Sequence, residues 1–584
     1  MLPFNPEMIM RNIVSLSFFI LMATLSVAQD ANGVFRAAGS PENPKVQISW
    51  NRYYNYAGIT DLCKKLAAAH PDLVKVSSIG KSFQGKEMWV LTVTDFKKGK
   101  PEEKPAYYLD GNIHSNEIQG SEMALYTAWY LAETYSSINF IKELLGDKVF
   151  YIVPTINPDA RDHFMKEPNS PHSPRSGVMP VDNDRDGLIN EDGFYDFDGD
   201  GNITQMIRRS PTGRFKKDPN DPRRVVPAKV DELGEYELLG FEAIDKDGDG
   251  RVGEDGTGFY DPNRDWAWKW QPNYIQGGAY KYPFSIPENR NVRDFVYAHP
   301  NIAGAQSFHN SGGMMLRGPG AEEDAGTYNA DDVRIYDAIG KKGEQLVPGY
   351  KYLVVYKDMY TVWGGELDWF YGSRGVYTFS NELFNSYQYF HKDRDEDGFG
   401  QGEAYEFDKS LLFGDAVVTW KEFNHPQYGK IEVGGAKKNF TRADPGFLLE
   451  SDAHRNMSFC IYHAYNMPKL EIEEIAEKSL GGGLTEVTAV ITNKRMMPTH
   501  ASQDLKFKIE RPDYISIQGA KVVAGVVVDN RDLNLTREQK NNPSTIEVDN
   551  VPGLGSVTVR WIISGGKYSI KVDSRKGGVV TKQK

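Results

Sequence analysis

Hydrophobic and polar residues form alternating blocks along much of the chain, and these blocks predict helices and strands in turn. Apolar residues recur at helical spacing from Ile59 to His70 and from Met123 to Tyr135. Period-two alternation or a short apolar run predicts strands around Tyr107 and at residues 73–79, 87–94, 149–156, 302–308 and 352–356. Strands that alternate with helices are typical of an α/β fold, in which helices pack on a sheet.

The pattern changes at two places. From about residue 169 to residue 260 hydrophobic periodicity fades and Asp, Gly and Asn dominate, which predicts an insertion in the α/β domain. After Pro468 strand-like alternation returns without any helical pattern, which predicts a β-sandwich. We therefore expect an α/β domain over residues 29–467 and an all-β domain over residues 468–584.

The amino terminus has the pattern of a secretory signal peptide. Arg11 precedes an apolar run from Ile13 to Leu25, and Ser26-Val-Ala28 is a small-residue cleavage pattern. A membrane anchor is the alternative, but the run is short for a bilayer span. We expect residues 1–28 to be removed and the mature chain to be secreted or periplasmic.

Charge and cysteine content narrow the possible functions. The formal net charge of the 584 residues is -12, which argues against nucleic acid as a partner. The two cysteines, Cys63 and Cys460, cannot form a disulfide framework. We expect both to be buried free thiols, with one isolated disulfide as the alternative.

Candidate metal ligands follow two of the predicted strands. His114 and Glu117 come just after the Tyr107 strand and its turn, and His309 lies at the end of the strand at residues 302–308. Sites in α/β sheets form at the carboxyl ends of strands, and imidazole and carboxylate groups are good zinc ligands. A single HxxE pattern is weak, but a second imidazole at another strand end strengthens it.

Together, an ordered set of motifs resembles the zinc carboxypeptidase family, which includes pancreatic carboxypeptidase A, over most of residues 50–385. The motifs are Pro71-Asp-Leu-Val74, Ile79-Gly-Lys-Ser-Phe-Gln-Gly-Lys86, His114 with Glu117, Asn157-Pro-Asp159, Asp261-Pro-Asn-Arg264, His309, Tyr360, Leu367-Asp-Trp369 and Glu382. The resemblance implies a mixed, doubly wound sheet with helices on both faces. It also implies a zinc metallocarboxypeptidase that hydrolyses the C-terminal residues of peptides.

The resemblance assigns a role to each matched residue. Zinc would be held by His114, Glu117 and His309, with Asp261 orienting the first histidine. Asn263 and Arg264 would bind the terminal carboxylate of the substrate. Tyr360 matches the mobile tyrosine and Glu382 the general base, because the family's intervals from the Asp-Trp pair are kept; a core role for Tyr360 is the alternative.

Two assignments from the resemblance are less direct. The family's carbonyl-polarising arginine follows the Asn-Pro-Asp motif, but the insertion breaks that interval; Arg208 is favoured, with Arg209 as the alternative. Leu367 matches the floor of the specificity pocket and implies an apolar C-terminal side chain, although the adjacent Glu366 weakens that expectation.

The chemistry of the matched residues agrees with these roles. Three protein ligands leave zinc one position for water, whose pKa falls towards about 7, and Glu382 can take its proton. A cell-wall peptidase or a γ-glutamyl peptidase of the same family is one alternative. A calcium-dependent binding module on an inactive hydrolase scaffold is another.

Four acidic loops with the pattern D-x-D-x-D-G are candidates for calcium sites. Their aspartates are Asp182, Asp184 and Asp186; Asp196, Asp198 and Asp200; Asp245, Asp247 and Asp249; and Asp393, Asp395 and Asp397. The first and third loops also share Glu-Asp-Gly and Phe-Tyr-Asp, so they form an internal repeat. Alternate carboxylates on a turn closed by Gly suit calcium. We expect calcium to order the insertion at the rim of the substrate cleft.

Overall fold

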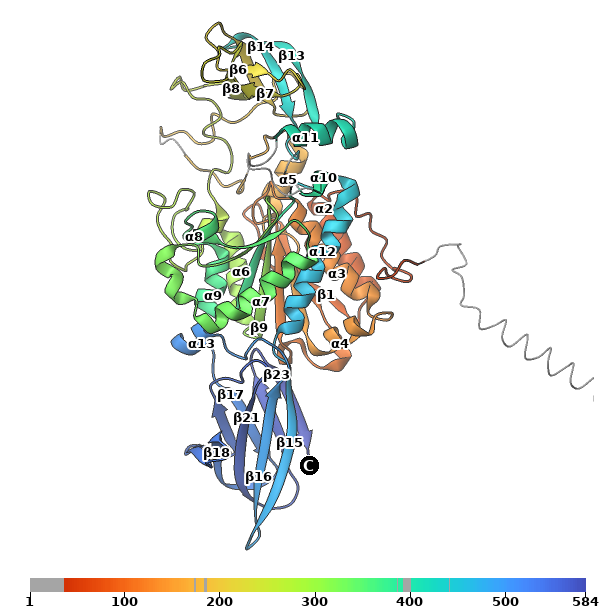
Figure 1. Cartoon of the computed structure of the whole chain (residues 1–584), viewed down its shortest axis with the longest axis vertical. Helices are drawn as coiled ribbons and strands as arrows, with labels where there is room; N and C mark the ends of the chain where they lie inside the picture. Colours follow the sequence, from red (N-terminus) through yellow and green to blue (C-terminus); the bar gives the residue numbers. More distant parts are fainter. Residues whose placement is uncertain (1–35, 173–174, 183–185, 386, 392–400, 441) are drawn as a thin grey trace, which may run out of the picture.

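The computed structural model describes residues 36–172, 175–182, 186–385, 387–391, 401–440 and 442–584. The predicted signal peptide lies outside these residues, as do Asp184, Asp393, Asp395 and Asp397. Figure 1 shows the α/β domain at the centre, a small sheet at one end of the long axis and an all-β domain at the other.

A mixed eight-stranded sheet forms the centre of the α/β domain, with the order β1-β2-β4-β3-β9-β12-β10-β11. The strands are β1 (Val74–Lys81), β2 (Glu87–Val93), β3 (Ala106–Gly111), β4 (Val149–Val153), β9 (Ile302–Asn310), β10 (Met314–Arg317), β11 (Lys351–Val354) and β12 (Tyr377–Leu383). The four central strands β4, β3, β9 and β12 are parallel, whereas β2 and β10 join them antiparallel.

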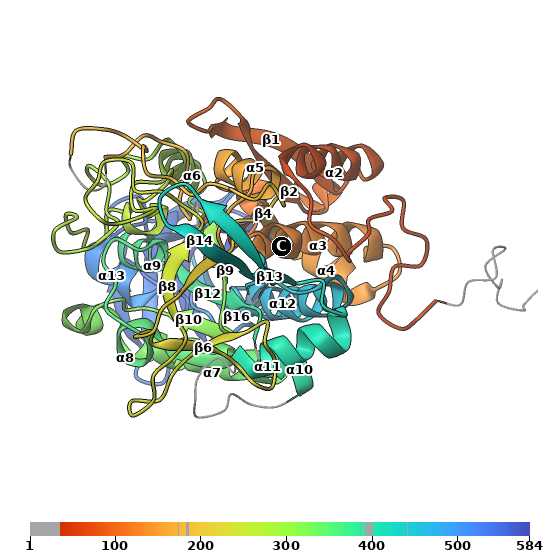
Figure 2. The same cartoon turned by 90° about the horizontal axis from the view of Figure 1, so that it is seen from above.

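Helices cover both faces of this sheet, as the resemblance predicted (Figure 2). One face packs on α2 (Tyr56–Ala69), α3 (Gln119–Thr134), α4 (Asn139–Asp147), α7 (Ala330–Leu346) and α12 (Gly446–Asn466). The other face packs on α6 (Pro287–Ala298) and α9 (Glu366–Arg374). The remaining helices are α5 (Pro158–Lys166), α8 (Val355–Asp358), α10 (Tyr387–Phe390), α11 (Gln401–Phe407) and α13 (Ser502–Phe507). Cys63 and Cys460 are buried free thiols in the first of these layers, as predicted.

The connection from β3 to α3 is very tight. All sixteen residues of α3 are buried, because this helix lies between the sheet and the outer helices α2 and α12. A Cβ atom on Gly111 would lie 2.5 Å from the carbonyl carbon of Gly120, so no larger residue fits at the end of β3. The short loop between them carries His114 and Glu117, and its backbone is thereby fixed between two buried elements.

Strands β5 to β8 of the insertion belong to a six-stranded sheet that we did not predict. Its order is β13-β14-β5-β8-β6-β7. The strands are β5 (Gln205–Arg209), β6 (Phe215–Lys217), β7 (Val225–Pro227), β8 (Tyr236–Phe241), β13 (Val417–His425) and β14 (Gly429–Ala436). The hairpin of β13 and β14 comes from far beyond the insertion and pairs with β5. Strands β5, β6 and β7 are short and only partly buried, so they lack the periodicity by which sequence reasoning finds strands.

The C-terminal region is a β-sandwich, as predicted. The first sheet is β15-β16-β21-β18-β19 and the second is β20-β17-β22-β23, with all pairs antiparallel. The strands are β15 (Leu470–Gly481), β16 (Leu484–Asn493), β17 (Asp513–Gln518), β18 (Lys521–Asn530), β19 (Leu535–Glu538), β20 (Thr545–Val548), β21 (Ser556–Ser564), β22 (Ser569–Ser574) and β23 (Gly578–Gln583). Inward side chains of both sheets, among them Val487, Trp561 and Ile570, share one apolar core.

A buried charged cluster joins the sandwich to the α/β domain. His500 contacts Asp504 at 3.0 Å and Asp513 at 3.3 Å through its two ring nitrogens. The Lys576 ammonium donates to Asp504 and to the Gly375 carbonyl, each at 3.0 Å. Burial opposes the positive charge, but the two carboxylates raise the pKa of His500 to about 9.

The variant His500→Gln tests this junction. The pKa of histidine in an unfolded chain is about 6.5, so the charged His500 contributes its full stability below that pH. The contribution fades as the pH rises through about 9. We expect thermal melts to show a deficit on the order of 2–3 kcal/mol at pH 6, and a much smaller one at pH 9.5. A deficit of equal size at both pH values would contradict this account.

Candidate metal centre and active site

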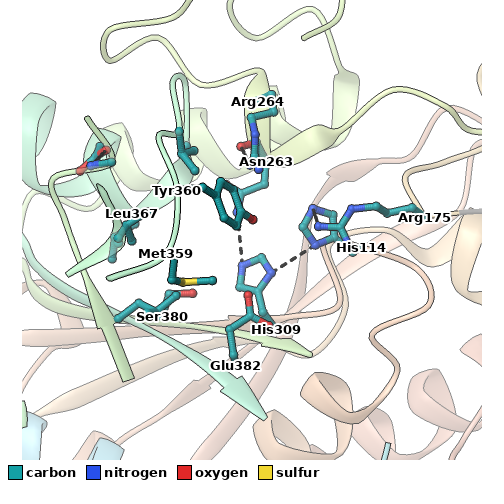
Figure 3. A pocket seen from close by; sticks show the side chains of 16 residues that line it. His114, Arg175, Asn263, Arg264, His309, Met359, Tyr360, Leu367, Ser380 and Glu382 are labelled. Carbon is teal, nitrogen blue, oxygen red and sulfur yellow. Dashed lines mark hydrogen bonds between the residues drawn. The ribbon is translucent and has the colours of Figure 1, made fainter. Parts of the chain in front are cut away.

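Three neighbouring parallel strands end at one edge of the sheet and carry the site. His114 and Glu117 follow β3, His309 lies near the end of β9 and Glu382 near the end of β12. In the sheet register His309 is directly opposite Glu382, so these two side chains lie on the same face. The sheet thus brings together residues from three distant parts of the chain; Figure 3 shows His114, His309 and Glu382 around the pocket.

The three predicted metal ligands converge on a single point. The Nδ1 atom of His114 lies 2.9 Å from Oε2 of Glu117, the Nδ1 atom of His309 lies 3.0 Å from the same oxygen, and the two nitrogens are 3.2 Å apart. All three side chains are at most 3 % exposed. Ligand atoms around a tetrahedral zinc ion with bonds of about 2.0–2.1 Å are about 3.3 Å apart, so this set has the size that zinc requires.

The outer ring nitrogens indicate which way the lone pairs point. Nε2 of His114 lies 2.8 Å from Oδ1 of Asp261, so it donates its proton to that carboxylate. Nε2 of His309 lies 3.4 Å from the Ser307 hydroxyl. Nε2 of His309 also lies 3.5 Å from Nδ2 of Asn263. When the ring protons are on the two Nε2 atoms, two Nδ1 lone pairs and a carboxylate oxygen face one point, and this donor set fits a divalent cation.

The other oxygen of Glu117 is partnered by arginines. Nη1 of Arg175 donates to Oε1 of Glu117 at 3.0 Å, and Nη2 of Arg442 lies 3.5 Å from the same atom. Burial alone would raise the pKa of Glu117, but the charges of His114 and Arg175 outweigh it and hold this pKa well below its ordinary value. Glu117 is therefore ionised, as a metal ligand must be.

Glu382 lines the same pocket as His114 and His309. Burial, followed by repulsion from the carboxylate of Glu117, raises the pKa of Glu382, while the charges of His309 and Arg175 oppose the rise. A carboxylate with a raised pKa is a stronger base at neutral pH, which suits proton transfer.

Asn263, Arg264 and Tyr360 also line the pocket (Figure 3), and Nδ2 of Asn263 is 3.5 Å from Nε2 of His309. Asp261 caps the short helix η3 (Pro262–Arg264) by accepting from the Asn263 amide at 2.7 Å. The amide oxygen of Asn263 accepts from the Glu366 amide at 2.8 Å, which fixes η3 against the start of α9. Arg264 is buried, whereas Tyr360 is 53 % exposed and is therefore not a core residue.

One wall of the pocket is apolar. It contains Leu316, Val355, Met359, Val362 and Leu367. Glu366 points away from this wall: its carboxylate is buried and accepts from the Ser307 hydroxyl at 3.1 Å. Burial and the neighbouring Asp110 raise the pKa of Glu366 well above its ordinary value, which favours its neutral form.

The comparison with known families agrees with this geometry. The model of the family described as zinc carboxypeptidase matches residues 59–186 and 240–397, which include every element of the site. The chain belongs to the zinc carboxypeptidase family. Residues 469–584, the sandwich of this family member, match a family described only as a domain of unknown function.

Individual relatives match only part of this family member. A zinc carboxypeptidase of Saccharothrix mutabilis subsp. capreolus is 30% identical over 111 residues, which is 19% of this chain and 25% of the relative. Carboxypeptidase Z of Rattus norvegicus is 36% identical over 109 residues, 18% of this chain and 17% of the relative. The alignments thus span about a quarter or less of these relatives.

Among solved structures, carboxypeptidase A from Helicoverpa armigera is similar over 74% of this chain and 76% of that one. The sequence identity is 14% and the TM-score is 0.43. A TM-score of that size does not establish a shared fold; the sheet order and helix layers described above define the fold.

The assignment of the carbonyl-polarising arginine requires a correction. Arg208 lies on β5 in the insertion sheet and pairs with Glu237, and Arg209 is beside Glu235, so neither lines the pocket. Both also fall in the gap between the matched segments of the family model. Arg175 lines the pocket instead. Sequence reasoning missed it because we assumed that the insertion began before the arginine, whereas the matched segment continues to residue 186.

The acidic loops lie apart from the metal centre. Three groups of carboxylates in the insertion each place their oxygens within 4.8 Å of one another: Asp192, Asp247 and Glu254; Asp196, Asp198 and Glu242; and Asp245, Asp247 and Asp249. Asp182 and Asp186 are in none of the groups that the described residues form. Calcium at these loops stays a prediction.

Two single-arginine variants test the correction. We expect Arg175→Ala to lower kcat/KM for peptide hydrolysis about 10²-fold, because a cation beside a reacting carbonyl contributes about that much. We expect Arg208→Ala, the matched control, to stay within about twofold of the wild type, since its guanidinium serves the insertion sheet. A large loss in Arg208→Ala with none in Arg175→Ala would restore the original assignment.

Proposed function

We propose that this chain is a zinc-dependent metallocarboxypeptidase that removes C-terminal residues from peptides. The observation that carries the proposal is that three metal-ligand atoms within 3.2 Å of one another and a buried arginine, Arg264, belong to one pocket. A metal and an arginine in one pocket suit a substrate that has a scissile bond and a free carboxylate close together.

His114, Glu117 and His309 would hold the zinc, which supplies polarisation of a water molecule when it is bound. Glu382 then acts as general base: its carboxylate, made more basic by burial, accepts the proton and passes it to the leaving amine. Asp261 holds His114 in the tautomer that directs its Nδ1 lone pair inward.

Two arginines would stabilise negative charge on the substrate, one at its terminal carboxylate and one at the scissile carbonyl oxygen. Arg264, oriented by Asn263, offers a planar fork to the terminal carboxylate, with Tyr360 beside it at the exposed side. Arg175 provides positive charge where the scissile carbonyl oxygen becomes negative. The carboxylates of Glu117, Asp261 and Glu382 outweigh the effect of burial and raise the pKa of Arg175, so it stays charged.

The preferred C-terminal side chain should be apolar. Leu316, Val355, Val362 and Leu367 form the wall that this side chain would contact. Asp368 also lines the pocket, but its oxygens already accept from the Gly320 amide at 2.8 Å and the Tyr328 hydroxyl at 3.1 Å. Burial raises the pKa of Asp368 to about 7, which further reduces its attraction for a basic side chain.

Export and calcium belong to this proposal as predictions. The pattern at residues 1–28 supports a secreted or periplasmic location, and no helix in the part of the chain that the structure describes is long and apolar enough to cross a membrane. The D-x-D-x-D-G loops support calcium as a second, structural ion.

The variant Glu382→Gln tests the proposed reaction. Removing the base while keeping the side-chain shape should lower kcat on a peptide with a C-terminal Phe at least 10³-fold, with zinc content unchanged. The wild type should leave the C-terminally amidated peptide intact, because Arg264 then has no carboxylate to bind. Full turnover by Glu382→Gln would contradict the assignment, and equal cleavage of the amide would favour an endopeptidase.

The variant Leu367→Asp tests the specificity pocket. A new carboxylate at this wall should lower kcat/KM for C-terminal Phe and Leu and raise it for C-terminal Lys and Arg, changing their ratio at least 10-fold. The matched control is Leu411→Asp, since Leu411 is 41% exposed and outside this pocket. Digestion of a mixed peptide library followed by mass spectrometry gives both ratios; equal ratios in the two variants would count against Leu367.

A further inference from the structure

In the insertion, each of two acidic repeats has an aspartate near its end, Asp192 or Asp255, that accepts hydrogen bonds from the backbone of the other repeat. Residues 182–193 and 245–256 share the pattern D-x-D-x-D-G followed by Glu-Asp-Gly. The Lys246 amide of the second repeat donates to both oxygens of Asp192, at 2.9 and 3.0 Å. In return the Asn190 amide of the first repeat donates to Asp255 at 2.7 Å. Reciprocal hydrogen bonds between aspartates and backbone amides therefore join the two repeats.

Five carboxylates converge on the second repeat as a result of this exchange. Oxygens of Asp245, Asp247 and Asp249 lie within 4.8 Å of one another, and so do oxygens of Asp192, Asp247 and Glu254. Asp247 belongs to both groups, which makes them one continuous cluster. Asp192 comes from the other repeat and is completely buried.

Glu254 has no partner in this cluster. Both of its carboxylate oxygens are buried, and neither accepts a hydrogen bond from the described residues. A buried carboxylate without a hydrogen-bond donor is costly, and a bound cation would offset that cost.

In the neighbouring acidic loop, a lysine side chain of the protein supplies the positive charge. The Lys421 ammonium lies 2.9 Å from Oδ2 of Asp198 and 3.6 Å from Asp200. Beside the second repeat, the Lys246 side chain donates to the Glu191 carbonyl, and Arg251 is 3.6 Å from Asp249 but 72% exposed. The five-carboxylate cluster thus has much more negative charge than these side chains neutralise.

We propose that Asp192, Asp245, Asp247, Asp249 and Glu254 bind one calcium ion that links the two acidic repeats. Calcium takes six to eight oxygen ligands in flexible geometry, which suits four carboxylates of one short loop together with a fifth from the other repeat. Gly250, with a φ of +91°, makes the sharp turn that such a loop needs after its third aspartate. Asp192 supplies from the other repeat the closing carboxylate that a twelve-residue calcium loop carries itself.

The ion would connect the two segments that lead to the active site. Arg175 precedes the first repeat, and Asp261, Asn263 and Arg264 follow the second. Linking Asp192 to the second repeat fixes these two segments relative to each other. We therefore expect calcium to raise kcat/KM; this consequence rests on the proposed function, whereas the binding of the ion does not.

Calorimetric titration of the full, zinc-loaded chain with calcium chloride tests the site after the protein has been freed of calcium. We expect Asp247→Asn and Glu254→Gln each to lose one binding equivalent, or to bind it at least 10-fold more weakly. The matched control is Asp231→Asn, an exposed aspartate of the same insertion that is outside the cluster. Asp247 is itself exposed and Gln has the shape of Glu, so both variants should keep the wild-type circular dichroism spectrum.

Wild-type stoichiometry and affinity in both cluster variants would overturn the site. Weak binding shared equally by all four proteins would overturn it as well, since it would mean a general acidic surface. If the equivalent is lost but calcium never changes kcat/KM of the wild type, the link to Arg175 and Asp261 is wrong. A wild type without peptidase activity would count against the proposed function, and the calorimetry would still decide the calcium site.

Discussion

Three lone pairs within 3.2 Å of one another, shielded from solvent, are the constraint on which the rest of this structure depends. His114, Glu117 and His309 direct two imidazole nitrogens and one carboxylate oxygen at one point. The surroundings hold them in place: Asp261 fixes the ring of His114, and Arg175 and Arg442 partner the outer oxygen of Glu117. A donor set that is pre-arranged in this way is suited to a metal.

The central sheet explains why such distant residues can meet. Strands β3, β9 and β12 are parallel neighbours, so their carboxyl ends lie at one edge, and the register sets His309 opposite Glu382. The close approach of Gly111 to Gly120 places the loop that carries His114 and Glu117 directly against the start of α3. The residues that we propose to bind the substrate come from η3 and from the start of α9, which are joined through Asn263. Rigid elements thus hold the reactive groups, and the loops supply the pocket wall.

Much of this arrangement could be predicted from the sequence, because the signals are local. The strands that lead to His114 and His309 begin with short runs of apolar or small residues, and the positions of Tyr360, Leu367 and Glu382 follow from one uninterrupted interval. Arg175 could not be placed in this way, because its distance from Asn157 depends on where the insertion begins. The insertion sheet was missed for a related reason: β5 needs β14 as its partner, more than two hundred residues later.

Glu366 and Leu367 illustrate a further limit. They are adjacent in sequence, yet the helix turn at the start of α9 directs Glu366 into the core beside Ser307 and Leu367 into the pocket.

Zinc K-edge X-ray absorption of the zinc-loaded chain tests the central claim most directly. We predict one zinc per chain with two imidazole ligands at about 2.0–2.1 Å, reduced to one imidazole in His309→Ala. A chain that binds no stoichiometric zinc, or an unchanged imidazole count in His309→Ala, would contradict the account.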